Sequence, residues 1–472
     1  MRQFNGLVRG VDGFARDRGG NFAVLFGAAA SVLALGVGFA VNISQLYNAR
    51  SSLQSVVDAA VTSTARDLTL GVIKEADANR SVQAFLDANS TAGILQADQI
   101  VLDKLSIDRT AKTVQADGHA DSALYFPLFS VGNMQRVTTS TLALYSDKKI
   151  EVAMMLDITG SMAADWRTKT NKIGDLQDAA SNAVKDLLKQ NRDPSDPRVR
   201  VAIVPYAEAV NTGALSGSVF VEEKGGPDLP PPLDAPVSAS VTPAKDKCAT
   251  ERKDKDGHAD TSSDGPSTSR RDNSGREYLA KVNRDDHMKT CPAPAVIPLT
   301  ADQDKLLVTI DHFSATGVTA GGIAAQWGYY MLSPSGRSAI VDARLGAGPA
   351  NFDPKKVAKI AILMTDGQFN TAFAGPRGAP KGQDQGQMAR SNAENICDNM
   401  KRDGIEVFTI GFDLNDPSMT TTERDQAKSV LKDCASADTS PLKHYYEAAN
   451  GAELSGAFEE ITQNIEKLTI RR

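Results

Sequence analysis

Apolar positions along the 472-residue chain follow three successive patterns, and the first is an uninterrupted apolar stretch at residues 22–41. Ser31 carries the only polar side chain in this stretch. About 20 apolar residues in a row are enough for a helix that crosses a lipid bilayer, so residues 22–41 predict a transmembrane helix. Apolar residues then recur at helical spacing, which predicts that the helix continues and packs on the segment after it; they are Ile43, Leu46, Leu53, Val56, Val57, Ala60 and Val61.

The second pattern covers residues 100–145, where short runs alternate between apolar and polar positions, as at Val101, Leu105 and Ile107. A period of two, with turn residues between the runs, is typical of half-buried strands. We therefore expect residues 42–148 to form a membrane-rooted helix followed by a small antiparallel sheet, an outline similar to that of a pilin.

The third pattern runs from residue 149 to residue 472, where continuous apolar runs alternate with segments of helical periodicity. The run at 150–156 is typical of a strand buried on both faces of a parallel sheet. Further strands are predicted at residues 199–205, 219–222, 360–365, 405–412 and 444–447, and helices at 173–190, 300–313, 323–332, 392–403 and 421–435. Strands that alternate with helices predict an α/β domain with a doubly wound, mostly parallel sheet.

Two segments interrupt this domain. Residues 225–295 are rich in Pro, Ser, Asp and Lys and poor in apolar residues, which predicts a flexible insertion. Residues 373–387 form a second Gly/Pro-rich loop. The last apolar positions are spaced by three or four and predict a helix that packs on the sheet; they are Leu454, Phe458, Ile461, Ile465 and Leu468.

Composition and charge exclude several classes of function. The net charge of −6 and the absence of a basic stripe argue against nucleic acid as a partner. Five histidines without paired spacing leave little basis for a zinc site. The sequence contains neither a Gly-rich phosphate loop nor a G-x-S-x-G elbow. We therefore do not expect an enzyme.

The residues before the transmembrane helix indicate its orientation. Residues 1–21 contain four arginines and two aspartates, so this tip is net basic. The positive-inside rule places such a tip in the cytoplasm and all that follows outside it. A cleaved signal peptide with a site at Gly38-Phe39-Ala40 is the alternative, but the apolar run is long for a signal peptide.

Four cysteines lie on the predicted outer side of the membrane: Cys248, Cys291, Cys397 and Cys434. In an oxidising compartment they can pair, and four cysteines allow three connectivities. We expect Cys248 to pair with Cys291, which closes the insertion, and Cys397 to pair with Cys434, which ties two helices around the strand at 405–412. Free buried cysteines are the alternative.

Candidate chemistry follows the strand at 150–156. Asp157, Thr159 and Ser161 stand at alternate positions of a tight turn, at the strand end where α/β sheets bind ligands. A carboxylate and two hydroxyls suit Mg²⁺, Mn²⁺ or Ca²⁺ rather than zinc or copper. Alternatively, these residues only cap the next helix.

The motif D-x-T-G-S-M at 157–162 resembles the metal-ion-dependent adhesion site of von Willebrand factor A domains, usually D-x-S-x-S. The resemblance implies a further Thr from a second loop and an Asp from a third. Thr319 and Asp366 fit these places, and Thr316 competes for the former. The implied metal, Mg²⁺ or else Mn²⁺ or Ca²⁺, would keep a position open for an Asp or Glu side chain of a protein partner.

The amino-terminal region is similar to TadG-like proteins of the Flp (tight adherence) pilus system. Their L-Q-x-x-x-D-A-A segment is matched by Leu53, Gln54, Asp58, Ala59 and Ala60, and their W-G-x-x-x-L-S-P element by residues 327–334. The resemblance implies a single-pass protein of the bacterial inner membrane. Most of the chain would lie in the periplasm and bind pilus-apparatus components.

Two other functions remain open. Pilin precursors are cut after a Gly, as at Gly20, but usually have Glu five residues later, where this chain has Leu25. A processed amino terminus would make the protein a minor pilin or a surface adhesin that displays the A domain. A cytoplasmic A domain would instead favour a subunit of an ATP-driven assembly or chelatase machine.

Overall fold

The computed structural model describes residues 21–69, 72–89, 100–126, 134–146, 148–165, 170–191, 193–219, 247–252, 258–263, 268–271, 277–280, 289–378, 384–440 and 442–470. Residues 1–20, which include all the charged residues of the basic tip and Gly20, lie outside these residues. The chain divides into two compact units, Met1–Ser146 and Asp147–Arg472.

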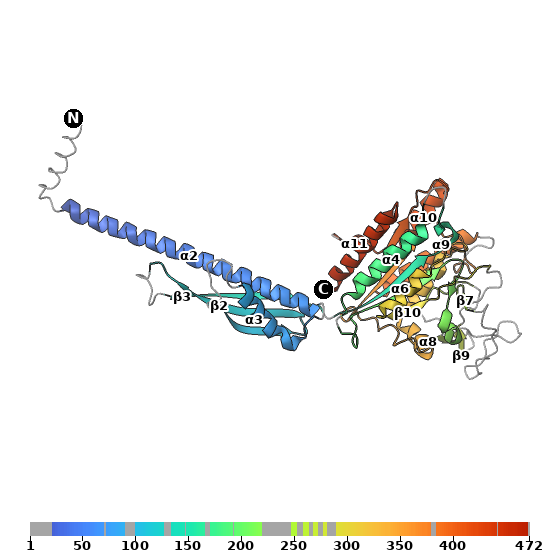
Figure 1. Cartoon of the computed structure of the whole chain (residues 1–472), viewed down its shortest axis with the longest axis horizontal. Coiled ribbons are helices and arrows are strands. Elements are labelled where there is room, and N and C mark those ends of the chain that lie inside the picture. Colours follow the sequence, from blue (N-terminus) through green and yellow to red (C-terminus); the bar gives the residue numbers. More distant parts are fainter. Residues whose placement is uncertain are drawn as a thin grey trace, which may run out of the picture. The chain divides into compact units, whose positions relative to one another are not determined.

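The first unit is built on one continuous helix, α2 (Asn21–Thr69) (Figure 1). Its first half is highly exposed, with Val24 at 71% and Leu33 at 70%. By length and composition, α2 is able to cross a membrane. An apolar surface of this kind is stable in hydrocarbon and costly in water.

The second half of α2 covers a three-stranded antiparallel sheet in the order β1-β2-β3. The remaining elements of this unit are η1 (Glu75–Asp77), α3 (Ala78–Asn89), β1 (Ile100–Asp108), β2 (Thr113–Ala123) and β3 (Met134–Leu144). Leu53, Val57 and Val61 of the predicted stripe are buried in the core between helix and sheet. Ile43 of the same stripe is 51% exposed, which differs from the prediction.

The second unit contains a mixed sheet in the order β13-β12-β11-β4-β5-β6-β7, with β10 also paired to β5. Five strands are parallel: β4 (Lys149–Asp157), β5 (Val199–Tyr206), β11 (Val357–Thr365), β12 (Glu406–Phe412) and β13 (Tyr445–Ala448). Three short strands are antiparallel: β6 (Val210–Asn211), β7 (Cys248–Ala249) and β10 (Ile297–Thr300). The predicted parallel, doubly wound arrangement therefore holds only in part.

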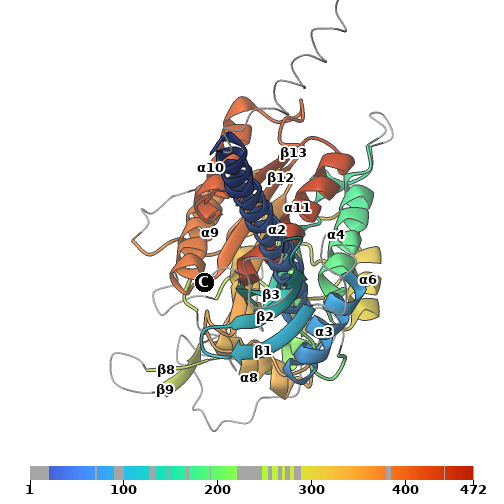
Figure 2. The same ribbon diagram turned by 90° about the vertical axis from the view of Figure 1, so that its left-hand side faces the viewer.

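Helices cover both faces of this sheet (Figure 2). One face packs on α4 (Lys172–Leu188), α6 (Gln303–Asp311) and α11 (Gly451–Ile470). The other packs on α7 (Gly321–Leu332), α8 (Arg337–Asp342), α9 (Gln385–Arg402) and α10 (Thr421–Cys434). The central parallel strands β4, β5, β11 and β12 are apolar over most of their length because both faces are covered.

The remaining described elements are short: η4 (Gly160–Met162), η5 (Gly213–Leu215), α5 (Ser216–Val219), β8 (Thr268–Arg271), β9 (Glu277–Ala280) and η6 (Pro334–Gly336). The strand predicted at residues 219–222 is wrong at Val219, because that residue ends α5. Residues 220–222 lie outside the described residues. Much of the predicted insertion at 225–295 also lies outside them. Both expected disulfides are present, Cys248–Cys291 and Cys397–Cys434.

Candidate metal centre

The carboxyl ends of β4 and β11 bring together the two predicted aspartates. These strands are parallel neighbours, and Leu156 of β4 pairs with Met364 of β11. Asp157 is the last residue of β4, and Asp366 follows directly after the end of β11. Both are buried, with exposures of 0% and 2%. Two carboxylates that are far apart in sequence therefore share one buried edge of the sheet.

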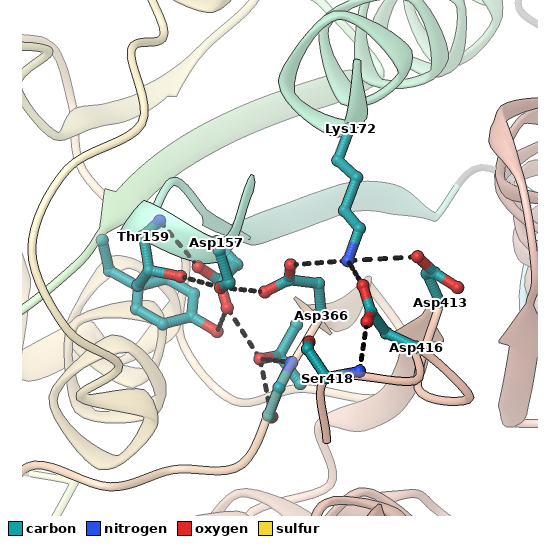
Figure 3. A network of polar contacts seen from close by, with 11 residues as sticks. Asp157, Thr159, Lys172, Asp366, Asp413, Asp416 and Ser418 are labelled. Carbon is teal, nitrogen blue, oxygen red and sulfur yellow. Dashed lines mark hydrogen bonds and ion pairs between the residues drawn. The ribbon is translucent and has the colours of Figure 1, made fainter. Parts of the chain in front are cut away.

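Hydroxyl groups of the loop after β4 connect these two carboxylates (Figure 3). The Thr159 backbone N–H donates to Asp157 Oδ1 at 2.9 Å, which closes the turn. Thr159 Oγ1 lies 2.9 Å from Ser161 Oγ, and Ser161 Oγ donates to Asp366 Oδ1 at 2.6 Å. Asp157, Thr159, Ser161 and Asp366 are thus connected in one hydrogen-bonded chain.

The position of the Asp157 carboxylate is set by two residues that were not predicted from the sequence, Thr365 and Tyr206. Thr365 Oγ1 donates to Asp157 Oδ2 at 2.7 Å. The Tyr206 hydroxyl lies 3.4 Å from the same oxygen and donates to the Met364 carbonyl at 3.0 Å. Tyr206 ends β5 and Thr365 ends β11, and both strands pair with β4. Hydroxyl side chains at the ends of predicted strands are therefore the sequence feature that could have identified them.

Thr319 lines the same cavity as Ser161 and Asp366 and is only 5% exposed. Its backbone N–H donates to Asn370 Oδ1 at 3.0 Å, and its carbonyl accepts from the Asn370 N–H at 3.0 Å. The loop that carries Thr319 is therefore fixed to the loop after β11. Thr316 is not among the residues that line the cavity; its backbone N–H donates to the Ile158 carbonyl at 2.8 Å.

A lysine, unforeseen from the sequence, lies beside the two aspartates. Lys172 at the start of α4 places its Nζ 3.3 Å from Asp366 Oδ2 (Figure 3). The same Nζ lies 3.1 Å from Asp413 Oδ2 and 3.3 Å from Asp416 Oδ2. Its side chain is only 9% exposed, although a lysine in a first helical turn is normally assigned to solvent.

Burial changes the acidity of this cluster. Burial, and then the neighbouring Asp157 charge, raise the pKa of Asp366 to about 7, although Lys172 and Ser161 act in the opposite direction. Burial also raises the pKa of Asp157. For Lys172, burial lowers the pKa, but three carboxylates led by Asp366 raise it by more, so the ammonium group stays charged. The charged forms of Asp157 and Asp366 are therefore only partly stabilised by their surroundings, and a bound cation would stabilise them further.

The cluster opens into a cavity of about 870 Å³. Ser161, Thr319 and Asp366 contribute to its wall, as does Gln368. Within the described part of the chain, Gln368 Oε1 is a buried oxygen without a hydrogen-bond partner. Among those residues no group of three His, Cys, Asp or Glu side chains is arranged around a metal position, so a metal here would depend on hydroxyl ligands. An all-oxygen donor set fits Mg²⁺, Mn²⁺ or Ca²⁺.

The amino-terminal region matches one protein family. Residues 20–67 match the family described as "Putative Flp pilus-assembly TadE/G-like". The resemblance to TadG-like proteins predicted from the sequence is confirmed over these residues. No curated protein has a significantly similar sequence.

Several solved structures with a distant overall similarity are those of pilus proteins. The pilus adhesin SpaC of Lactobacillus rhamnosus GG has a TM-score of 0.36 at 12% identity, over 78% of this chain and 35% of SpaC. The von Willebrand factor domain of the type V pili tip protein Mfa5 of Porphyromonas gingivalis has a TM-score of 0.36 at 13% identity, over 69% of this chain and 97% of that domain. The minor pilin PilB of Streptococcus sanguinis has a TM-score of 0.34 at 12% identity, over 78% of each chain.

Proposed function

We propose that this protein is a membrane-anchored periplasmic component of a Flp-type pilus apparatus. Its second unit would bind a divalent cation, preferably Mg²⁺, and through that cation an acidic side chain of a protein partner. The proposed ligands are Asp157, Thr159, Ser161, Thr319 and Asp366.

The observation that carries the proposal is the pair of Asp157 and Asp366, which Thr159 and Ser161 connect and of which Asp366 lines an open cavity. The two carboxylates balance the charge of a divalent cation, so the occupied site carries no excess negative charge that would repel a further carboxylate. A hard cation held largely by hydroxyl oxygens keeps its affinity for a further carboxylate. The cavity leaves room for a partner side chain to approach from solvent.

The membrane anchor and the compartment rest on separate observations. The exposed apolar half of α2 and the family match of residues 20–67 support an anchor in the membrane. Two disulfides support an oxidising compartment such as the periplasm. The basic residues before α2 favour a cytoplasmic amino terminus.

Titration of the metal-free, detergent-solubilised full chain with Mg²⁺ tests the cation site. Calorimetry should detect one site in the wild type and none in Asp157→Ala. Ser161→Ala, which removes one exposed hydroxyl, should weaken binding without affecting the core. Asp196→Ala is the matched control, because Asp196 is a 76% exposed aspartate before the amino end of β5. Equal Mg²⁺ affinity in wild type and Asp157→Ala would refute the proposed site.

A further inference from the structure

The ammonium group of Lys172 connects the candidate metal centre to a different loop. One of its three carboxylate partners, Asp366, belongs to the proposed metal ligands. The other two, Asp413 and Asp416, lie in the segment 413–419 between β12 and α10, which we call the acidic loop. An ammonium group has three N–H donors, so Lys172 has one donor for each carboxylate.

Asp366 has no oxygen that is free of a partner in this arrangement. Oδ1 accepts from Ser161 and Oδ2 accepts from Lys172. A cation that binds Asp366 therefore meets a second positive charge a few ångströms away, in a buried site where like charges repel strongly. Lys172 and a divalent cation compete for the same carboxylate.

The acidic loop is organised to keep Lys172 when it leaves Asp366. Asp413 lies at a positive φ of 51°, a conformation that aspartate adopts more readily than most residues, and its Oδ2 is 3.1 Å from Lys172 Nζ. The Asp416 carboxylate is held separately, because its Oδ1 accepts the Ser418 backbone N–H at 2.8 Å. Contacts with Lys172, after those with Ser418, help to lower the pKa of Asp416, so this carboxylate stays ionised. Two charged partners therefore remain for the ammonium group after the loss of Asp366.

We propose that Lys172 acts as a tethered competitor of the divalent cation for Asp366 and thereby sets the affinity of the metal centre. Metal binding shifts the ammonium group toward Asp413 and Asp416, and this shift transmits metal occupancy to the acidic loop. The inference rests on the proposed cation site. It adds a residue that determines affinity and a segment that responds to the metal.

Two substitutions with opposite expected effects test this role. Lys172→Met keeps the length of the side chain and removes its charge, so we expect Mg²⁺ to bind about tenfold more tightly or better. Asp416→Asn removes one of the two alternative partners, so the ammonium group stays with Asp366 and Mg²⁺ binds more weakly. Lys149→Met is the matched control, because Lys149 pairs with Asp196 at the start of β4.

Calorimetric Mg²⁺ titration and hydrogen exchange of the full chain provide the two readouts. In the wild type, Mg²⁺ should change exchange in the acidic loop, and in Lys172→Met this change should be absent. Binding by Lys172→Met alone would support competition for Asp366 but overturn both the proposed cation site of the wild type and the transmission of metal occupancy to the acidic loop. Equal affinities in wild type and both variants would overturn the inference while leaving the proposed function intact. Absence of binding in all proteins would overturn both.

Discussion

Removal of the disulfide between α9 and α10 is the perturbation whose effect on stability follows most directly from the structure. Cys397 lies in α9 and Cys434 ends α10, so the bond joins two helices that cover the same face of the sheet. In the sequence, α9 precedes β12 and α10 follows it. The two residues are 1% and 0% exposed. The double variant Cys397→Ala/Cys434→Ala removes the bond without introducing a polar group into this core.

The size of the effect follows from the length of the closed loop. The cysteines are separated by 37 residues. In the chain-entropy model, a loop of this length stabilises the folded state by about 4 kcal/mol at 25 °C. With a denaturant slope of roughly 5 kcal/mol per molar guanidinium, the unfolding midpoint falls by about 0.8 M.

Guanidinium unfolding of the full chain, followed by tryptophan fluorescence, measures this shift, because Trp327 is completely buried in the second unit. Variants must be compared under non-reducing conditions, so that the Cys248–Cys291 bond stays intact in both proteins. An unchanged midpoint in the double variant would refute the conclusion that this bond stabilises the fold.

Two further predictions concern charged groups of the second unit. The pKa of Asp366 is raised from 3.8 to about 7, so the folded protein retains a proton that the unfolded chain loses; in EDTA, stability should fall as the pH rises from about 4 to 7. Asp366→Asn should flatten this part of the curve of melting temperature against pH, and parallel curves would contradict the assignment. At the opposite end of the sheet, Glu151 is 1% exposed and pairs with the buried Lys359. Glu151→Ala should cost about 3–5 kcal/mol in chemical denaturation, because it leaves a buried charge without its partner; a loss below about 1 kcal/mol would show that Lys359 finds another partner.

Elements with long, strongly patterned runs could be predicted from the sequence. The apolar runs that became β4, β11 and β12 are buried on both faces, and this burial is what their composition indicates. The resemblance to von Willebrand factor A domains implied that Asp157 and Asp366 belong to one site, and the structure places both at the carboxyl ends of neighbouring parallel strands. The local sequence pointed to Asp157, Thr159 and Ser161, and the family resemblance added Asp366.

Short edge strands could not be predicted in the same way. β6 and β7 have two residues each, and β10 has four. Such segments carry too little periodicity to be recognised, and their pairing depends on the neighbouring strand. These antiparallel strands make the sheet mixed where a mostly parallel one was expected.

The residues around the metal centre that were missed have roles that depend on tertiary contacts. Tyr206 and Thr365 belong to strands whose sequences indicate only burial, yet both contact the Asp157 carboxylate. Lys172 begins an amphipathic helix, in which a charged side chain is normally expected to be exposed to solvent. Its burial becomes favourable only when Asp366, Asp413 and Asp416 arrive from segments that lie far along the chain.

Capture of protein partners with and without Mg²⁺ tests the central claim most directly. The detergent-solubilised full chain and its Asp157→Ala variant would each be incubated, in Mg²⁺ or in EDTA, with extracts that contain the pilus apparatus. Pilus-apparatus proteins should be recovered only by the wild type and only with Mg²⁺, while both proteins melt at similar temperatures in EDTA. Identical recovery by both proteins, or recovery that does not depend on Mg²⁺, would contradict the proposed function.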